Sequence, residues 1–159
     1  LMGRAQTAGD LVAFVPDANV MFTGDIVEDH SACYCGDGHF HDWTGTLDKI
    51  RGWDLDAVAP GRGGALIGSD KVNAALDSTA DFVRSTYRPV ARVALRGGSL
   101  KEAWDACRAE CDPKFSGYAI YEHCLPFNVA RAYDEALDID TPRIWTAERD
   151  RQMWHDLQG

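Results

Sequence analysis

The sequence contains no run of about 18 apolar residues, the minimum for a helix that spans a membrane. Its first residues, Leu1–Thr7, lack the apolar segment of a secretory signal peptide, and position 1 is not methionine. We therefore expect a chain that is truncated at its front. The five cysteines are an odd number, and without secretory features they predict free thiols in a reducing, cytoplasmic compartment.

Basic residues are scarce relative to acidic ones. The chain has 16 Lys plus Arg against 25 Asp plus Glu, which gives a formal net charge of −9. A nucleic-acid binder needs a basic surface that displaces counterions from phosphates, so this balance argues against nucleic acid as a partner. It argues equally against an anionic membrane surface. The length of 159 residues fits one domain, or one domain with a helical appendage.

The first third of the sequence is predicted to be rich in β-strands. Two apolar runs, 11–15 and 20–23, flank Pro16-Asp17-Ala18-Asn19, whose proline and asparagine are typical of a turn. The pattern predicts an antiparallel hairpin over residues 10–26. Because both runs are almost continuously apolar, we expect strands that are covered on both faces.

A helix and a third strand are predicted after an irregular segment over residues 27–41. Asp42 can cap a helix, and apolar residues then recur at helical spacing. These residues are Trp43, Leu47, Ile50 and Trp53. The apolar run 57–59 ends at a glycine-rich loop over 60–64. This order of elements predicts an α/β fold, with a small unrelated α+β domain as the alternative.

The remaining residues are predicted to be helical. Apolar residues recur at helical spacing from Val72 to Tyr87, and Pro89 is expected to kink or end that helix. The segment Ser99-Leu100-Lys101-Glu102 is a capping box, which predicts a helix as far as Cys111. Asp112-Pro113 is expected to stop that helix.

Two further helices are predicted towards the C-terminus. One covers residues 129–137, and Thr146 can cap the other. The apolar positions of the last helix are Met153, Trp154 and Leu157. We predict a division of the chain into residues 1–68, which hold the strands, and residues 69–159, a helical extension that packs on them.

Three short segments in order carry a family resemblance. They are Gly3-Arg4-Ala5-Gln6-Thr7-Ala8-Gly9-Asp10, Phe22-Thr23-Gly24-Asp25 and Ala59-Pro60-Gly61-Arg62-Gly63. Together they resemble the second half of the metallo-β-lactamase superfamily, an αββα sandwich of metal-dependent hydrolases. The resemblance covers residues 3–68. It implies half of such a sandwich, with a small, mostly antiparallel sheet, followed by a helical extension. The superfamily's N-terminal half, with its His-x-His-x-Asp-His motif, is absent.

The resemblance implies a metal ligand at Asp25, because the superfamily places a bridging aspartate there. Gln6 and Arg62 stand where the superfamily has histidines. An amide oxygen is a weak ligand for zinc, and a guanidinium has no lone pair to offer. The implied cofactor is a divalent metal ion, zinc first, in a complete parent protein, with no metal in this chain as the alternative. Without the resemblance, Asp25 would be read as a loop residue that caps its own turn.

Other residues are candidates for the substrate or for support of the site. Arg62 can receive an anionic substrate group or pair with Asp25, in which case it competes with a metal, or it is simply a solvated loop residue. His123 and Tyr34 are further substrate candidates, with a core position as the alternative for His123. Asp10 and Thr7 are expected to support the hairpin through hydrogen bonds, with a plain turn as the alternative.

Several cysteines and histidines lie close in sequence without a recognisable ligand pattern. Cys33, Cys35, His39 and His41 do not have the two separated pairs of a structural zinc site. We expect a substrate-facing loop or an exposed connection there. His39-Phe40-His41-Asp42 imitates part of the superfamily's metal motif, but it follows Asp25 and lacks the final histidine.

The favoured hypothesis for function is the C-terminal portion of a metallo-β-lactamase-like hydrolase of an ester, lactone, thioester or related bond in a small-molecule substrate. The chain alone is expected to be inactive. The alternative is a non-catalytic, metal-free binding or scaffold module with an anion site at Arg62. Half a sandwich would leave one sheet face bare. We therefore expect a homodimer through the sheet, or association with the missing N-terminal half.

Overall fold

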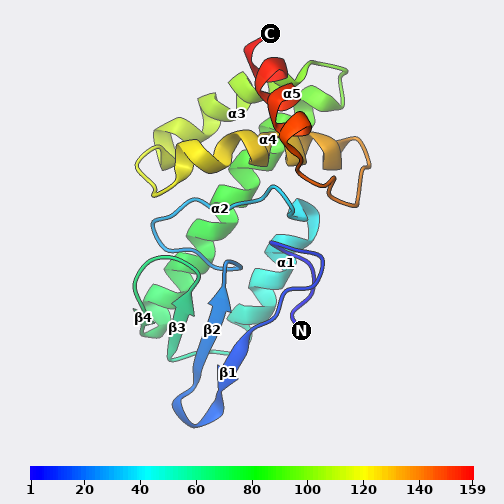
Figure 1. The fold of residues 1–159 in the computed structure, drawn as a ribbon. Helices are drawn as coiled ribbons and strands as arrows, with labels where there is room; N and C mark the ends of the chain where they lie inside the picture. The colour runs from blue at the N-terminus through cyan, green and yellow to red at the C-terminus, as the bar shows by residue number, and fades with distance from the viewer.

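A four-stranded mixed sheet forms one end of the computed structural model, which describes residues 1–159 (Figure 1). The strands lie in chain order, and their bounds are β1 Ala13–Val15, β2 Val20–Gly24, β3 Ala57–Pro60 and β4 Leu66–Ile67. β2 pairs with β1 in antiparallel and with β3 in parallel orientation, and β4 is antiparallel to β3. This confirms the predicted hairpin and the α/β class. The hairpin turns through a 3-10 segment, Pro16–Ala18, and Asn19 takes a left-handed conformation.

The helix α1, Phe40–Arg51, connects β2 to its parallel neighbour β3. It buries Trp43, Leu47 and Ile50, as the spacing predicts, whereas Trp53 lies beyond its end. The helix begins two residues before the predicted Asp42. The Glu135 carboxylate accepts hydrogen bonds from the backbone N–H groups of Phe40 (2.9 Å) and His41 (3.0 Å), and so caps the helix from a distant segment.

The two faces of the sheet differ in burial. One face carries Met21, Val58 and Leu66, which belong to a single core with residues of α1 and of the next helix. The other face is apolar at every paired position, with Ala13, Val15, Val20, Phe22, Ala57, Ala59 and Ile67. The expectation that both faces are covered is wrong for this chain, because Phe22 is 52% and Ile67 69% exposed.

The helix α2, Ser69–Ala94, runs from the sheet into the helical part of the molecule (Figure 1). It contains Pro89, so of the two expectations for this proline, a kink or an end, the end of the helix is wrong. A proline inside a helix removes one backbone hydrogen bond and costs about 3 kcal/mol. Pro89 is buried beside Val90 and Val93, and packing of this face outweighs that cost.

Three more helices complete the fold, namely α3 Leu100–Phe115, α4 Tyr121–Ala136 and α5 Ala147–Gln158. The capping box at Ser99 and Glu102 is present, and the Thr146 hydroxyl caps α5 by accepting from Arg149 N. α3 continues four residues beyond Cys111, and α4 begins eight residues before residue 129. The expected stop at Asp112-Pro113 is therefore wrong, because Pro113 lies inside α3, and the predicted start at residue 129 is wrong for α4.

One hydrophobic core of 32 buried residues includes side chains from both predicted units, from Met21 in β2 to Val129 in α4. The division at residue 68 coincides with the start of α2 and stays a prediction. In α5, Met153 and Leu157 are buried, but Trp154 is 45% exposed, so its assignment to the apolar face is wrong. No helix is both long enough and apolar enough to cross a membrane.

Candidate functional site

The candidate site lies where the parallel strands β2 and β3 end. Asp25 directly follows β2, and Arg62 lies two residues after β3. Parallel strands bring their carboxyl ends to the same edge of a sheet, where ligands of α/β proteins commonly bind. Arg62 Nη1 donates to Asp25 Oδ2 (3.0 Å) and to Glu28 Oε1 (2.6 Å). The structure thus joins the predicted Asp25 and Arg62, and adds Glu28, which sequence reasoning missed.

Two glycines allow the loop after β3 to lie against the segment after β2. A Cβ atom on Gly61 would lie 2.7 Å from the backbone nitrogen of Asp25, so only glycine fits there. Gly63 has a φ of +98°, and a Cβ on it would lie 2.6 Å from the carbonyl oxygen of Asp29. The glycine-rich sequence is therefore the local cause of the contact between Arg62 and the two carboxylates.

Further hydrogen bonds hold the segment that carries the carboxylates. The indole N–H of Trp43 in α1 donates to the carbonyl of Ile26 (3.0 Å). The Thr79 hydroxyl in α2 accepts from Glu28 N (3.2 Å) and lies 3.2 Å from Glu28 O, to which it can donate. Arg62 O accepts from Asp29 N (3.1 Å). Hydrogen bonds from α1 and α2 therefore hold the segment that carries Glu28.

Glu28 is the most unusual group of the site. Its side chain is only 1% exposed, and its Oε2 atom has no hydrogen-bond partner. Burial, and then the charge of Asp25, raise the pKa of Glu28 to about 7 despite the opposing effect of Arg62. Burial works against the charge on Arg62, but the two carboxylates outweigh it and raise the pKa of that guanidinium. A buried carboxylate with an orphaned oxygen depends on its one cationic partner.

Two buried thiols lie close to this charged group. Burial raises the pKa of Cys33 well above its ordinary value, and the nearby charge of Glu28 adds to this effect. Burial likewise raises the pKa of Cys124 to about 11, opposed by Arg62. Both thiols are therefore protonated at neutral pH, and neither is a nucleophile or a thiolate ligand as it stands.

The donor set at this site does not fit a divalent metal ion. The two carboxylates both face a permanent cation, and Arg62 has no lone pair for coordination. No group of three or more His, Cys, Asp or Glu side chains is arranged to hold a metal. Gln6, which stands where the resemblance implies a histidine, forms no side-chain hydrogen bond. The residues of this chain therefore support no chemical step through a metal at this site.

Asp10 and Thr7 order their own turn. The Asp10 carboxylate accepts hydrogen bonds from Thr7 N (3.0 Å) and from the Thr7 hydroxyl (2.9 Å). Asp10 also pairs through its backbone with Gly3, which closes the segment into a short bridge. These contacts lie within the turn itself, as the plain-turn alternative has it, and support of the hairpin by Asp10 and Thr7 stays a prediction.

Tyr34 and His123 gather around Phe127 of α4. Their rings lie 5.9 and 6.0 Å from the ring of Phe127, which also packs at 4.9 Å against Trp145. Burial raises the pKa of Tyr34 to about 12. Neither side chain forms a hydrogen bond or ion pair with Arg62 or Asp25. Their role as substrate residues stays a prediction.

The loop with Cys33 and Cys35 is held inside the protein, so the expectation of an exposed connection is wrong. Asn128 of α4 accepts from Cys35 N (2.6 Å) and donates to the carbonyl of Cys33 (2.8 Å), and both cysteines are buried. His39 is also buried, and its Nδ1 accepts from Arg4 Nη2 (2.6 Å). The cysteines and histidines of this loop therefore have separate partners.

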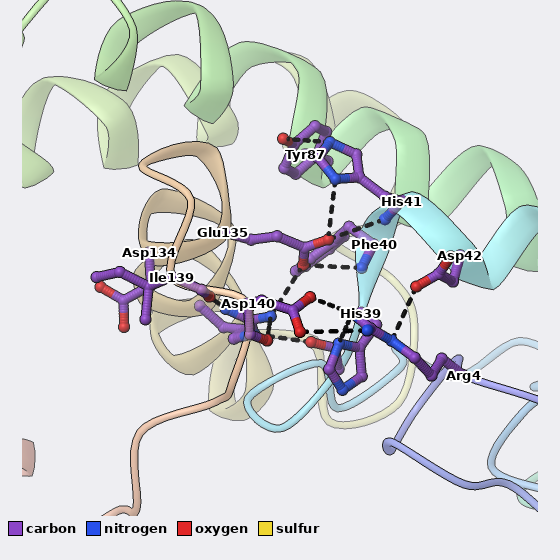
Figure 2. A network of polar contacts seen from close by, with 12 residues as sticks. Arg4, His39, Phe40, His41, Asp42, Tyr87, Asp134, Glu135, Ile139 and Asp140 are labelled. Carbon is purple, nitrogen blue, oxygen red and sulfur yellow. Dashed lines mark hydrogen bonds and ion pairs between the residues drawn. The ribbon is translucent and has the colours of Figure 1, made fainter.

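A polar network around Glu135 was not predicted from the sequence (Figure 2). Arg131 is fully buried and donates to the carbonyls of Gly38, Ile139 and Asp140 at 2.7 to 2.9 Å. Glu135 accepts from the start of α1, and its Oε1 lies 3.4 Å from His41 Nδ1. His41 Nε2 in turn lies 2.7 Å from the Tyr87 hydroxyl. The network joins α4 to α1. An i,i+4 Arg–Glu pair is the only sequence signal for it.

Comparison with known proteins gives a partial structural likeness. No family model and no curated protein matches the sequence. Similar solved structures include VMB-1 (22% identity, TM-score 0.46), a metallo-β-lactamase from Pontibacter korlensis (20%, 0.45) and DIM-1 metallo-β-lactamase (20%, 0.46). The matches cover 53–54% of this chain and 39–40% of those chains. The likeness concerns the arrangement of elements over half of the chain, so function is argued from the residues of this chain.

Proposed function

We propose that this chain is a non-catalytic, metal-free binding module with a metallo-β-lactamase-like fold. The observation that carries the proposal is the bridge from Arg62 Nη1 to both Asp25 and Glu28. A cation that belongs to the chain lies between the two carboxylates that a metal ion would need. In this proposal, the guanidinium of Arg62 takes the place that a metal ion would have between the two carboxylates.

The burial of Glu28 supports a structural role for this bridge. A carboxylate that is 1% exposed loses its hydration, and its charge is tolerated only beside a partner. Arg62 is 38% exposed and reaches Glu28 from the surface. Nη1 donates to both carboxylates, so this end of the guanidinium is held by groups of the chain itself. This argues for a structural cation rather than for a subsite that awaits an anionic substrate.

The binding surface of the proposed module is the apolar outer face of the sheet. Its seven paired positions carry no charged or polar side chain, although the chain as a whole has a net charge of −9. A second copy of the same chain fits this face, because sheet-on-sheet packing would bring two uncharged faces together and keep the acidic surfaces apart. An N-terminal half of the same fold is the alternative occupant.

Calorimetric titration with Zn²⁺ tests the metal-free proposal. We expect no binding to the unmodified protein, and binding to Arg62→His, in which an imidazole joins Asp25 and Glu28. Arg62→Gln is the matched control, since it removes the cation without adding a strong ligand, and it should bind less zinc than Arg62→His. Stoichiometric zinc binding by the unmodified protein would contradict the proposal.

A hydrolase role in a longer protein is the second candidate function. It is favoured by the position of Asp25, whose carboxylate is 34% exposed at the end of two parallel strands. Zinc, Mn²⁺ or another divalent ion would then need ligands from outside this chain. Hydrolysis of ester, lactone or thioester substrates with zinc by a longer protein that contains this chain and the missing ligands, abolished by Asp25→Asn, would favour this candidate over the binding module.

A further inference from the structure

Four arginines form a row that winds gradually around α2 and continues just beyond its end. Arg84, Arg88, Arg92 and Arg96 are spaced four residues apart, and all four are exposed. The row extends over about 18 Å, because each step of four residues advances about 6 Å along a helix. None of the four forms a side-chain hydrogen bond or an ion pair. Only two other basic side chains of the chain, Lys71 and Arg151, share this property.

The row is unfavourable for the isolated chain. Like charges one helical turn apart repel each other, and here three successive pairs do so without a carboxylate between them. Acidic residues are abundant in this sequence, and elsewhere they pair with most of the basic ones. The repulsion is relieved when an anionic partner lies along the row.

The row borders a groove between α2 and α3. Figure 1 shows that this half of α2 lies away from the sheet. A hollow of about 450 Å³ is lined by Arg84, Arg88 and Arg92 together with Pro89, Ala91 and Leu95. It continues past Arg92 into a second hollow that is lined by Arg96, Ala106 and Ala109. The groove is therefore lined by cations along one edge and also by apolar side chains. One of these, Leu95, is 73% exposed.

The other charged groups of the groove are already paired. Asp81 and Glu110 both lie beside Lys114, at 3.4 and 3.1 Å from its Nζ atom. Neither reaches an arginine of the row. The net charge that faces a ligand along this edge is therefore positive, although the whole chain is acidic.

We propose that this groove is the docking site for an acidic amphipathic helix of a protein partner. Carboxylates that are one helical turn apart on such a helix repeat at the same distance of about 6 Å as the arginines. Each guanidinium can then form a charge-assisted pair with a carboxylate. Apolar side chains on the adjoining face of the partner helix would cover Leu95 and the small residues of the groove.

Nucleic acid fits this surface less well than an acidic helix. A phosphate backbone would satisfy the arginines, but it would leave the exposed Leu95 uncovered. A long polyanion would also be repelled by the rest of the surface, because the whole chain, arginine row included, has a net charge of −9. A short acidic helix engages the row without extending over the acidic surface.

Fluorescence anisotropy with a labelled synthetic peptide tests the docking site. The probe is a helical peptide with four glutamates one turn apart and leucines on the adjoining face. We expect saturable binding that weakens with salt, and a loss of affinity of at least about tenfold in Arg88→Gln/Arg92→Gln. The matched control is Lys71→Gln/Arg151→Gln, which removes the same charge from two other unpaired, exposed positions and should leave the affinity unchanged.

Three results would overturn the proposal. The first is no binding of the peptide to the unmodified chain. The second is an equal loss of affinity in both double variants, which would indicate an effect of net charge alone. The third is tighter binding of a single-stranded oligothymidylate through the same arginines, which would assign the row to nucleic acid. Circular dichroism of each variant verifies that the helices are intact, as expected for substitutions at exposed positions.

Discussion

Arg62 is the residue on which the account of the site depends. Its guanidinium occupies the space between Asp25 and Glu28, and the glycines at 61 and 63 are what allow it to lie there. The glycine-rich sequence over 60–64 predicts a loop at this position. An arginine in that loop argues against a metal ion, because a guanidinium has no lone pair to offer. The buried partner Glu28 could not be predicted, because a glutamate in an irregular segment carries no sign of burial.

The free energy of unfolding is expected to carry a pH dependence from Glu28. Its folded pKa of about 7 lies above its ordinary value of 4.5, so the folded state retains a proton that the unfolded state has released. This contribution to stability is present in full at low pH and is lost as the pH rises from about 4.5 to 7. Replacing Glu28 by Gln removes the titration, so the stability of Glu28→Gln relative to the unmodified protein should increase between pH 5 and pH 8.

Urea unfolding at several pH values checks this prediction. Asp29→Asn is a suitable control, because this neighbouring carboxylate does not contact Arg62. Parallel pH profiles for Glu28→Gln and the unmodified protein would show that Glu28 titrates normally, and the account of its burial would be wrong.

At the scale of elements, features that depend on neighbouring residues could be predicted, whereas features that depend on distant contacts could not. The hairpin turn at Pro16–Ala18 and the caps at Ser99 and Thr146 depend on neighbouring residues, and the sequence predicted each of them. The start of α1 depends on Glu135, about 95 residues further along the chain. Pro89 was expected to kink or end its helix and Asp112-Pro113 to stop another, whereas α2 and α3 both continue through their prolines.

Glu135 is expected to be essential for the junction between α1 and α4. Glu135→Ala would leave the buried guanidinium of Arg131 without its carboxylate, and two N–H groups of α1 without an acceptor. Loss of one partner of a buried charge pair destabilises a protein by about 3–5 kcal/mol. Glu135→Gln keeps one acceptor oxygen and should cost less.

Urea unfolding gives the free energies of these variants, and amide hydrogen exchange at Phe40 and His41 locates the effect. Faster exchange at these two positions is expected in Glu135→Ala. If Glu135→Ala and Glu135→Gln were both as stable as the unmodified protein, the network would have no role in stability.

At the scale of the whole molecule, the proposal of a binding module depends on two features, the exposed sheet face and the Arg62 bridge. The apolar character of the strands was evident from the sequence. Which face is covered could not be predicted, because period-two patterning does not reveal a face that is apolar and bare. The basic groove could not be predicted from the net charge, because that number averages over the whole surface.

The proposed dimer should dissociate when a charge is placed on the sheet. Phe22→Glu puts a carboxylate in the middle of the outer face, next to Ala13 and Ala59, where a second sheet would desolvate it. Sedimentation velocity is expected to give a dimer for the unmodified chain and a monomer for Phe22→Glu. Trp154→Glu, at an exposed aromatic position of α5, is the control and should remain a dimer. A monomeric unmodified chain would contradict the dimer.

The most direct test of the central claim is the thermal unfolding of the unmodified chain with EDTA and with added Zn²⁺. A metal that binds the folded state raises the unfolding temperature, by more at higher affinity and concentration, and a chelator that removes it lowers the temperature again. Because Arg62 already donates hydrogen bonds to both Asp25 and Glu28, we predict the same unfolding temperature in buffer, EDTA and zinc. A rise with zinc that EDTA reverses would contradict the account and identify the strand ends as a metal site.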